Sequence, residues 1–218
     1  MILICKKLLP FLFLVLTLTL CSRAAPTLSY VYMQVVYFEE EPDTYIPRMS
    51  FFVIANDDDG IEDIAELRLY NDFEGLVWKC TPEDWTMLIE NSKTWIGSRN
   101  LVMPTGESFP SGQYRAVIAD KGGDQSEKRF GFDVIAQSRY PFPKFNIAEG
   151  VYTVESLYPA NSFICYNSLG EYRNTLTIPS KTGNIPDLHL SNDIAFIALW
   201  CEDKENSVSA VTRQISIK

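Results

Sequence analysis

Residues 110–134 constrain the fold most strongly, because they have the pattern of two strands joined by a tight turn. Apolar side chains alternate with others from Tyr114 to Ile118, which is the two-residue period of a pleated strand. The glycine-containing segment 120–124 then breaks the strand, since glycine adopts positive φ without steric cost. Alternation resumes over residues 130–134, so this stretch predicts a β-hairpin.

The same plan recurs near the C-terminus, in residues 197–217, when Asp120 is aligned with Asp203 without a gap. A second short match places residues 52–56 on residues 163–167. The two matches are 64 residues apart in the first half and 36 in the second. This pattern indicates two related β-domains of unequal length, although strands of period two also resemble one another by chance.

We therefore expect an all-β fold of two tandem antiparallel β-sandwiches. The first would occupy residues 25–136 and the second, smaller one residues 144–218. Residues 137–143 hold two prolines and are expected to form an extended linker between them.

One short helix is expected in the first domain, near residues 82–91. Thr81 suits the N-cap position, and Asp84 lies three residues further on, close to a capping box. The apolar residues that follow at helical spacing, and that would share one face, are Trp85, Leu88 and Ile89.

Residues 1–24 have the parts of a secretory signal peptide. Lys6 and Lys7 precede an apolar stretch, residues 8–20, which is too short for an ordinary membrane-spanning helix. The alternative is an uncleaved anchor. We expect the mature chain to lie outside the cytoplasm, in a periplasm or on an outer surface, where disulfides persist.

Cys21 adds a second possibility at this end of the chain. The residues before it, Leu18 to Leu20, resemble the lipobox of bacterial lipoproteins, in which the cysteine is acylated and becomes the first residue. The resemblance implies a lipid anchor at Cys21, and simple cleavage after residue 24 is the alternative.

Charge and motifs exclude several classes of function. The net charge is −9, and it becomes −12 without residues 1–24, which argues against binding nucleic acid or docking electrostatically on anionic lipid. The chain has a single histidine, His189, and neither a glycine-rich phosphate loop nor a Cys-x-x-Cys pair. No catalytic constellation is recognisable, so we expect a protein that is not an enzyme.

One acidic turn could hold calcium through oxygen ligands. Its candidate ligands are Asp57, Asp59, Glu62 and Asp63. The same residues are ordinary components of a solvated turn at the end of a sheet, and that reading requires no cofactor.

Three tryptophans lie within 18 residues: Trp78, Trp85 and Trp95. Exposed together they would form an aromatic binding surface for a partner or a sugar. Packed under the expected helix they would instead belong to the core, which is the usual place of aromatic residues at helical spacing.

Three segments carry a family resemblance: residues 55–64, residues 95–98 and residues 110–115. The first resembles the Asp-rich turn, and the last the Pro-x-Gly-x-Tyr entry to a late strand, of bacterial immunoglobulin-like and fibronectin III-like domains. With residues 95–98, the first half is similar to uncharacterised exported lipoproteins of spirochaetes. The resemblance implies two immunoglobulin-like sandwiches, although such folds host many functions.

The resemblance also implies a disulfide between Cys165 and Cys201. The internal match places them on Ile54 and Ile118, and immunoglobulin-like domains often bridge two facing core strands. Closing this loop of 36 residues would stabilise the domain by about 3–4 kcal/mol. Two buried free thiols are the alternative, and Cys80 has no evident partner.

These observations lead to a functional expectation. We expect a non-catalytic, exported protein, lipid-anchored if Cys21 is acylated, that binds an envelope or surface protein or has a structural role there. The alternative is an accessory module that binds carbohydrate or calcium.

Overall fold

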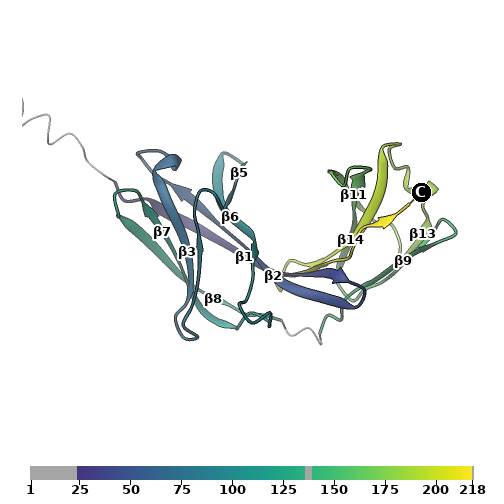
Figure 1. The fold of residues 1–218 in the computed structure, drawn as a ribbon, viewed down its shortest axis with the longest axis horizontal. Coiled ribbons are helices and arrows are strands. Elements are labelled where there is room, and N and C mark those ends of the chain that lie inside the picture. The colour runs from purple at the N-terminus through teal and green to yellow at the C-terminus, as the bar shows by residue number, and fades with distance from the viewer. Residues whose placement is uncertain (1–23, 136–138, 218) are drawn as a thin grey trace, which may run out of the picture.

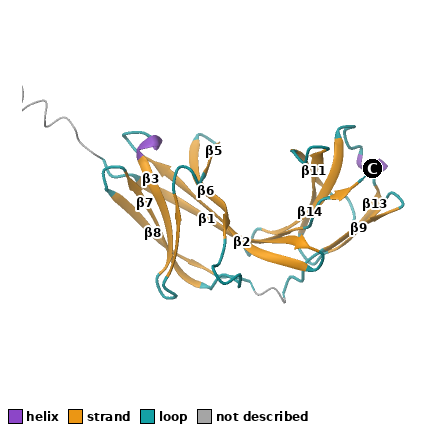
Figure 2. Cartoon of the chain, viewed as in Figure 1, coloured by secondary structure: helices purple, strands orange, loops and turns teal. Residues whose placement is uncertain are grey.

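The computed structural model describes residues 24–135 and 139–217, so the signal segment and Cys21 lie outside the described residues. Within the described ranges the chain is built of strands, with two short 3-10 turns, η1 (Ile61–Asp63) and η2 (Pro186–Leu188) (Figure 2). The strands are β1 (Thr27–Glu41), β2 (Thr44–Asn56), β3 (Ile64–Asn71), β4 (Leu76–Cys80), β5 (Thr86–Glu90), β6 (Lys93–Leu101), β7 (Gly112–Asp120), β8 (Gln125–Phe132), β9 (Lys144–Ala148), β10 (Val151–Glu155), β11 (Ala160–Asn167), β12 (Tyr172–Thr177), β13 (Thr182–Asn184), β14 (Ile194–Asp203), β15 (Val208–Val211) and β16 (Ile215–Ser216).

The first lobe is a sandwich of two antiparallel sheets. Strands β5, β6, β2 and β1 pair in that order, and they pack on a sheet of order β4-β3-β7-β8. Alternate residues of each strand point inward, because successive side chains of a strand lie on opposite faces. The core residues contributed by the two sheets include Phe51, Leu67, Ile96, Tyr114 and Ile118, each at most 1% exposed.

The second lobe repeats this plan on a smaller scale. Strands β12, β11, β14 and β15 form one sheet, with β16 also paired to β14, and β13-β10-β9 form the other. Aromatic rings fill the space between the sheets. Phe163 lies with its ring centroid 5.1 Å from those of both Phe145 and Tyr152. The all-β fold of two immunoglobulin-like sandwiches is thus confirmed.

The long β1–β2 hairpin belongs to both lobes (Figure 1). Residues Val35–Phe38 of β1 pair in parallel with Val208–Val211 of β15, so that one nine-stranded sheet runs through the whole molecule. The chain also crosses between the lobes in the predicted linker, where Phe142 stacks on Tyr45 with ring centroids 4.9 Å apart. Backbone hydrogen bonds therefore join the two lobes, in addition to the covalent connection.

The helix expected near residues 82–91 is not present, and that prediction is wrong. The predicted cap does form a single turn, in which the hydroxyl of Thr81 donates to Asp84 Oδ2 at 2.7 Å. The chain then continues as β5, which pairs with β6 through a two-residue turn at Asn91 and Ser92. A helix of two turns is marginal on its own, whereas pairing with β6 satisfies the backbone of this segment.

The two lobes are related through strands that the sequence alignment only partly identified. Order β4-β3-β7-β8 of the first lobe corresponds to order β12-β11-β14-β15 of the second. Asn71 and Asn167 end equivalent strands, and each is buried and accepts hydrogen bonds from its turn backbone. Asp120 and Asp203 end the next equivalent pair, as the alignment predicted.

The predicted disulfide between Cys165 and Cys201 is wrong. The alignment placed these cysteines on β2 and β7, which lie in opposite sheets, whereas β11 and β14 are neighbours in one sheet. Cys201 is paired with Asn161, four positions from Cys165, which corresponds to about 13 Å along a strand. That separation exceeds the reach of a disulfide, about 7 Å between Cα atoms, and both thiols are free.

Candidate functional site

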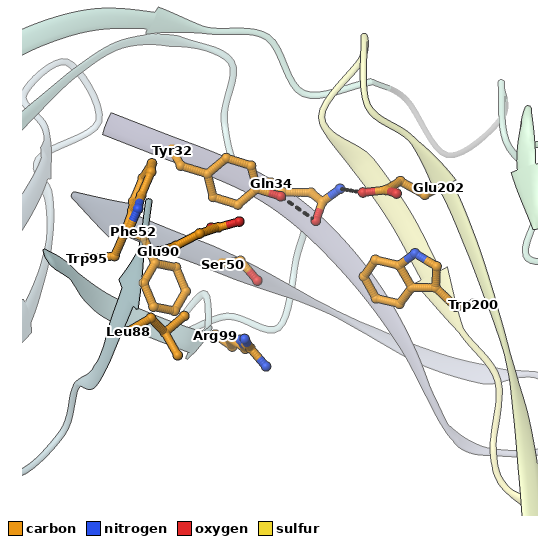
Figure 3. Close-up of a pocket in the computed structure, with 10 residues that line it drawn as sticks. All are labelled: Tyr32, Gln34, Ser50, Phe52, Leu88, Glu90, Trp95, Arg99, Trp200 and Glu202. Carbon is orange, nitrogen blue, oxygen red and sulfur yellow. Dashed lines mark hydrogen bonds between the residues drawn. The ribbon is translucent and has the colours of Figure 1, made fainter. Parts of the chain in front are cut away.

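A hollow of about 430 Å³ lies on the outer face of the nine-stranded sheet, where the two lobes meet (Figure 3). Side chains from both lobes border it. They are Tyr32, Gln34, Ser50, Phe52, Leu88, Glu90, Trp95, Arg99, Trp200 and Glu202.

The period of two along each strand explains how these side chains come together. Each contributing strand supplies residues two or four positions apart, which therefore share the outward face. The floor comes from the β1–β2 hairpin, one wall from β5 and β6 of the first lobe, and the opposite wall from β14 of the second (Figure 3). The hollow thus depends on the hairpin that the two lobes share.

A chain of hydrogen bonds crosses the hollow. The hydroxyl of Tyr32 donates to Gln34 Oε1 at 2.9 Å, and Gln34 Nε2 donates to Glu202 Oε1 at 3.2 Å. Burial, and then the negative charge of Glu202, raise the pKa of Tyr32, so its hydroxyl remains a neutral donor. These bonds hold the floor and the far wall in a fixed relation.

The remaining lining combines aromatic rings with charge. Trp95 packs edge-on against Tyr30, with ring centroids 5.7 Å apart, and the Arg99 guanidinium lies 6.0 Å from the centroid of Phe52. Aromatic faces, one cation and two carboxylates are therefore presented together. This surface can stack on planar or apolar groups and can hydrogen-bond polar groups of a ligand.

The three tryptophans singled out from the sequence lie in different places. Trp78 is buried in the first lobe, and its Nε1 donates to the carbonyl of Val102 at 2.8 Å. Trp85 is half-buried against the same core, and only Trp95 lines the hollow. Trp200 also lines the hollow and was not predicted from the sequence, although its alternation with buried Leu199 and Cys201 along β14 indicated an outward position.

The acidic turn is arranged differently from the expected ligand set. Carboxylate oxygens of Asp57, Asp63 and Asp120 lie within 4.8 Å of one another, and these residues could hold a cation. Asp57 Oδ2 is buried and has no hydrogen-bond partner among the described residues. Of the other predicted ligands, Asp59 contacts Asp57 through its backbone N–H at 2.9 Å, and Glu62 is outside the group. Asp120 joins from β7, which sequence spacing did not reveal.

The described cysteines are poorly suited to act as nucleophiles or redox-active thiols. Cys80, Cys165 and Cys201 are all buried. Burial raises the pKa of Cys80 to about 11 and that of Cys201 to about 12, so the reactive thiolate is scarce at neutral pH.

Within residues 24–135 and 139–217, no helix is long and apolar enough to cross a membrane.

Neither a family model nor a curated protein matches this chain. Among solved structures, it is similar to the BSP domain of a biofilm-associated protein, with 15% identity, a TM-score of 0.30, and coverage of 87% of this chain and 29% of that one. It is also similar to Tp47, the 47-kilodalton lipoprotein of Treponema pallidum, with 11% identity, a TM-score of 0.45, and coverage of 89% and 52%. The chain spans about half of that lipoprotein and less than a third of the biofilm-associated chain.

Proposed function

We propose that this chain is a non-catalytic, exported binding protein that engages another envelope or surface protein through the hollow between its lobes. The observation that supports this is that four aromatic side chains from both lobes line one concave surface: Tyr32, Trp95 and Trp200 are partly exposed, and Phe52 is buried in its floor. Aromatic residues and arginine are enriched where proteins bind one another, and Arg99 lies among these rings.

The polar lining fits binding better than catalysis. It offers Glu90, Glu202, Arg99 and Ser50, without a histidine or cysteine to act as base or nucleophile beside them. The carboxylate of Glu202 already accepts a hydrogen bond from Gln34.

Attachment to a membrane through an acylated Cys21 is part of the proposal. The intact mass of protein extracted from membranes tests it. A chain that starts at Cys21 and carries added acyl mass supports anchoring.

The binding test compares two aromatic truncations in otherwise identical protein. Envelope fractions of the source cells are chemically cross-linked to the wild type, to Trp95→Ala and to Phe73→Ala. Phe73 is 92% exposed in the turn before β4, outside the lining of the hollow, so it is the matched control. A defined partner lost with Trp95→Ala and retained with Phe73→Ala supports the proposal. Equal capture by all three proteins contradicts it.

Carbohydrate is a second candidate ligand for the same hollow. Rings beside carboxylates, as Trp200 beside Glu202, offer both a stacking face and acceptors for hydroxyl groups. Glycan-array binding that requires Trp95 and Trp200, without any captured protein, would favour this candidate over the first.

A further inference from the structure

Strand β5 leaves one edge of the nine-stranded sheet open. Among the described strands it pairs with β6 alone, and all five of its residues are exposed, including Met87, Leu88 and Ile89 at 45%, 39% and 77%. Natural edge strands are usually protected by charge, proline or a bulge. The edge strand at the other end of this sheet, β12, is mostly polar and carries Arg173 near its start, whereas β5 has three consecutive apolar residues and its one charge, Glu90, lies beside the turn. The apolar centre of this edge, Met87 to Ile89, therefore requires an explanation.

The turn of the β5–β6 hairpin shows which backbone groups of β5 are free. Asn91 and Ser92 have φ of 51° and 60°, as in a two-residue type I′ turn, and Glu90 pairs with Lys93 beside it. The residues flanking such a turn bond to each other, and bonded positions then alternate along the strand. Thr86, Leu88 and Glu90 consequently bond to β6, while the N–H and C=O groups of Met87 and Ile89 point to the open edge.

This edge is complementary to itself. If a second β5 runs antiparallel with Leu88 on the two-fold axis, Met87 faces Ile89 of the second copy, and both residues have outward backbone groups. Two such pairs supply four backbone hydrogen bonds, and Leu88 meets its own counterpart at a non-bonded position. Thr86 then faces Glu90, so no like charges are opposed. Hydrogen bonding and apolar matching are thus satisfied in the same register.

We propose that the protein self-associates by antiparallel pairing of β5 with β5 of a second copy. The functional consequence of this pairing rests on the proposed binding function of the hollow. Leu88 and Glu90 line the hollow, and a two-fold axis perpendicular to the sheet places both hollows on the same face. The pair would then present two adjacent sites to a surface that carries repeated partners, which raises avidity.

The interface is small and each copy is acidic, with a net charge of −9 for the full sequence and −12 without residues 1–24. Association is therefore weak and dependent on concentration. Moderate salt screens the repulsion between copies and is expected to favour the dimer. Sedimentation at increasing protein concentration, in low and in physiological salt, measures both effects.

Cysteine cross-linking tests the register directly. The two Leu88 residues would have Cα atoms about 4.5 Å apart, within the range of a disulfide, so Leu88→Cys should form a covalent dimer under mild oxidation. Thr86→Cys is the matched control on the same strand and face. The two Thr86 residues would be about 13 Å apart, so this variant should cross-link no more than the wild type with its own cysteines.

Ile89→Pro separates pairing from folding. Its N–H faces the open edge, so proline removes an intermolecular bond and leaves the hairpin intact. We expect Ile89→Pro to be monomeric and as thermally stable as the wild type. Met87→Lys should also abolish pairing, because it places two ammonium groups at the interface.

Two results would overturn self-pairing: a wild type that is monomeric at all concentrations, and Leu88→Cys and Thr86→Cys cross-linking at equal rates. A monomeric wild type whose capture of an envelope protein is lost in Ile89→Pro would also overturn it, because the edge would then accept a strand from another protein. The loss of capture in Trp95→Ala is measured in a separate experiment. The proposed binding function can therefore hold even if β5 does not pair with a second copy.

Discussion

Gln34 and Glu202 lie 168 positions apart and are joined by a hydrogen bond of 3.2 Å between Gln34 Nε2 and Glu202 Oε1. Gln34 is 4% exposed, so its amide has little access to water as an alternative partner. The bond connects the floor of the hollow, in β1, with the wall supplied by β14. A substitution that removes this bond therefore affects both the shape of the hollow and the stability of the protein.

Glu202→Ala is expected to lower the free energy of unfolding by about 1–2 kcal/mol, because it leaves the buried amide of Gln34 unsatisfied. Urea denaturation measures the change. Lys204→Ala is the matched control: Lys204 is highly exposed and loses only an ion pair of 3.8 Å with Glu202, which is worth little in water. Equal losses in the two variants would contradict the role assigned to the Gln34 bond.

Labelling of free thiols tests the cysteine assignment. We expect Cys80, Cys165 and Cys201 to resist labelling in the native protein and to react fully after denaturation without reductant, since they are buried and unpaired. If Cys165 and Cys201 both stay unreactive until a reductant is added, they form a disulfide and the paired register of β11 and β14 is incorrect.

Stability should fall in alkaline solution. Burial raises the pKa of Cys80 to about 11 and of Cys201 to about 12, from an ordinary value of 9.0. The unfolded chain therefore loses protons first as the pH rises above 9, and ionisation favours unfolding until the folded thiols also titrate. Urea midpoints at pH 8 and pH 10 measure this effect. Replacing Cys201 with Ala should reduce the fall in urea midpoint between pH 8 and pH 10. An unchanged fall would contradict the assignment of this effect to the buried thiol.

Gly97→Ala is expected to destabilise the first lobe by about 1–3 kcal/mol, because no space exists for a side chain there. A Cβ on Gly97 would lie 2.0 Å from the carbonyl oxygen of Phe51, next to an irregularity in the β2–β6 pairing. Thermal unfolding measures the loss. Gly131→Ala is the control, since its Cβ would lie 3.4 Å from the flexible side chain of Gln113, and its stability should change little.

Millimolar calcium is expected to raise the Tm of the wild type, because it would neutralise the three converging carboxylates only in the folded state. Asp120→Asn should abolish most of the shift. Asp58→Asn, in the same turn but outside the group, should retain it. Absence of any shift in the wild type would leave these residues as a solvated turn.

Much of the fold could be predicted from local pattern. The alternation in Tyr114 to Ile118 identified β7, and the glycines after Asp120 located its turn. The match of Asp120 with Asp203 also found equivalent strand ends in the two lobes. These predictions succeeded because a strand with one buried face records its periodicity in the sequence, whatever its partners are.

The errors came from features that depend on pairing. Thr81 and Asp84 do form the predicted capping contact, but the next residues pair with β6, and a local signal cannot reveal that competition. Cys165 and Cys201 were assigned to facing strands, because a period of two does not distinguish strands of opposite sheets from neighbours within one.

The sequence by itself determined that this chain forms strands and where many of them turn, because those properties depend on alternation and on residues such as glycine. The tertiary structure alone decided which strands became neighbours. It extended β1 into the second lobe and brought Trp95 and Trp200 to one hollow. The physical reason is that sheet hydrogen bonds join backbone groups, which are alike in every strand, so the choice of partner depends on how whole sheets pack.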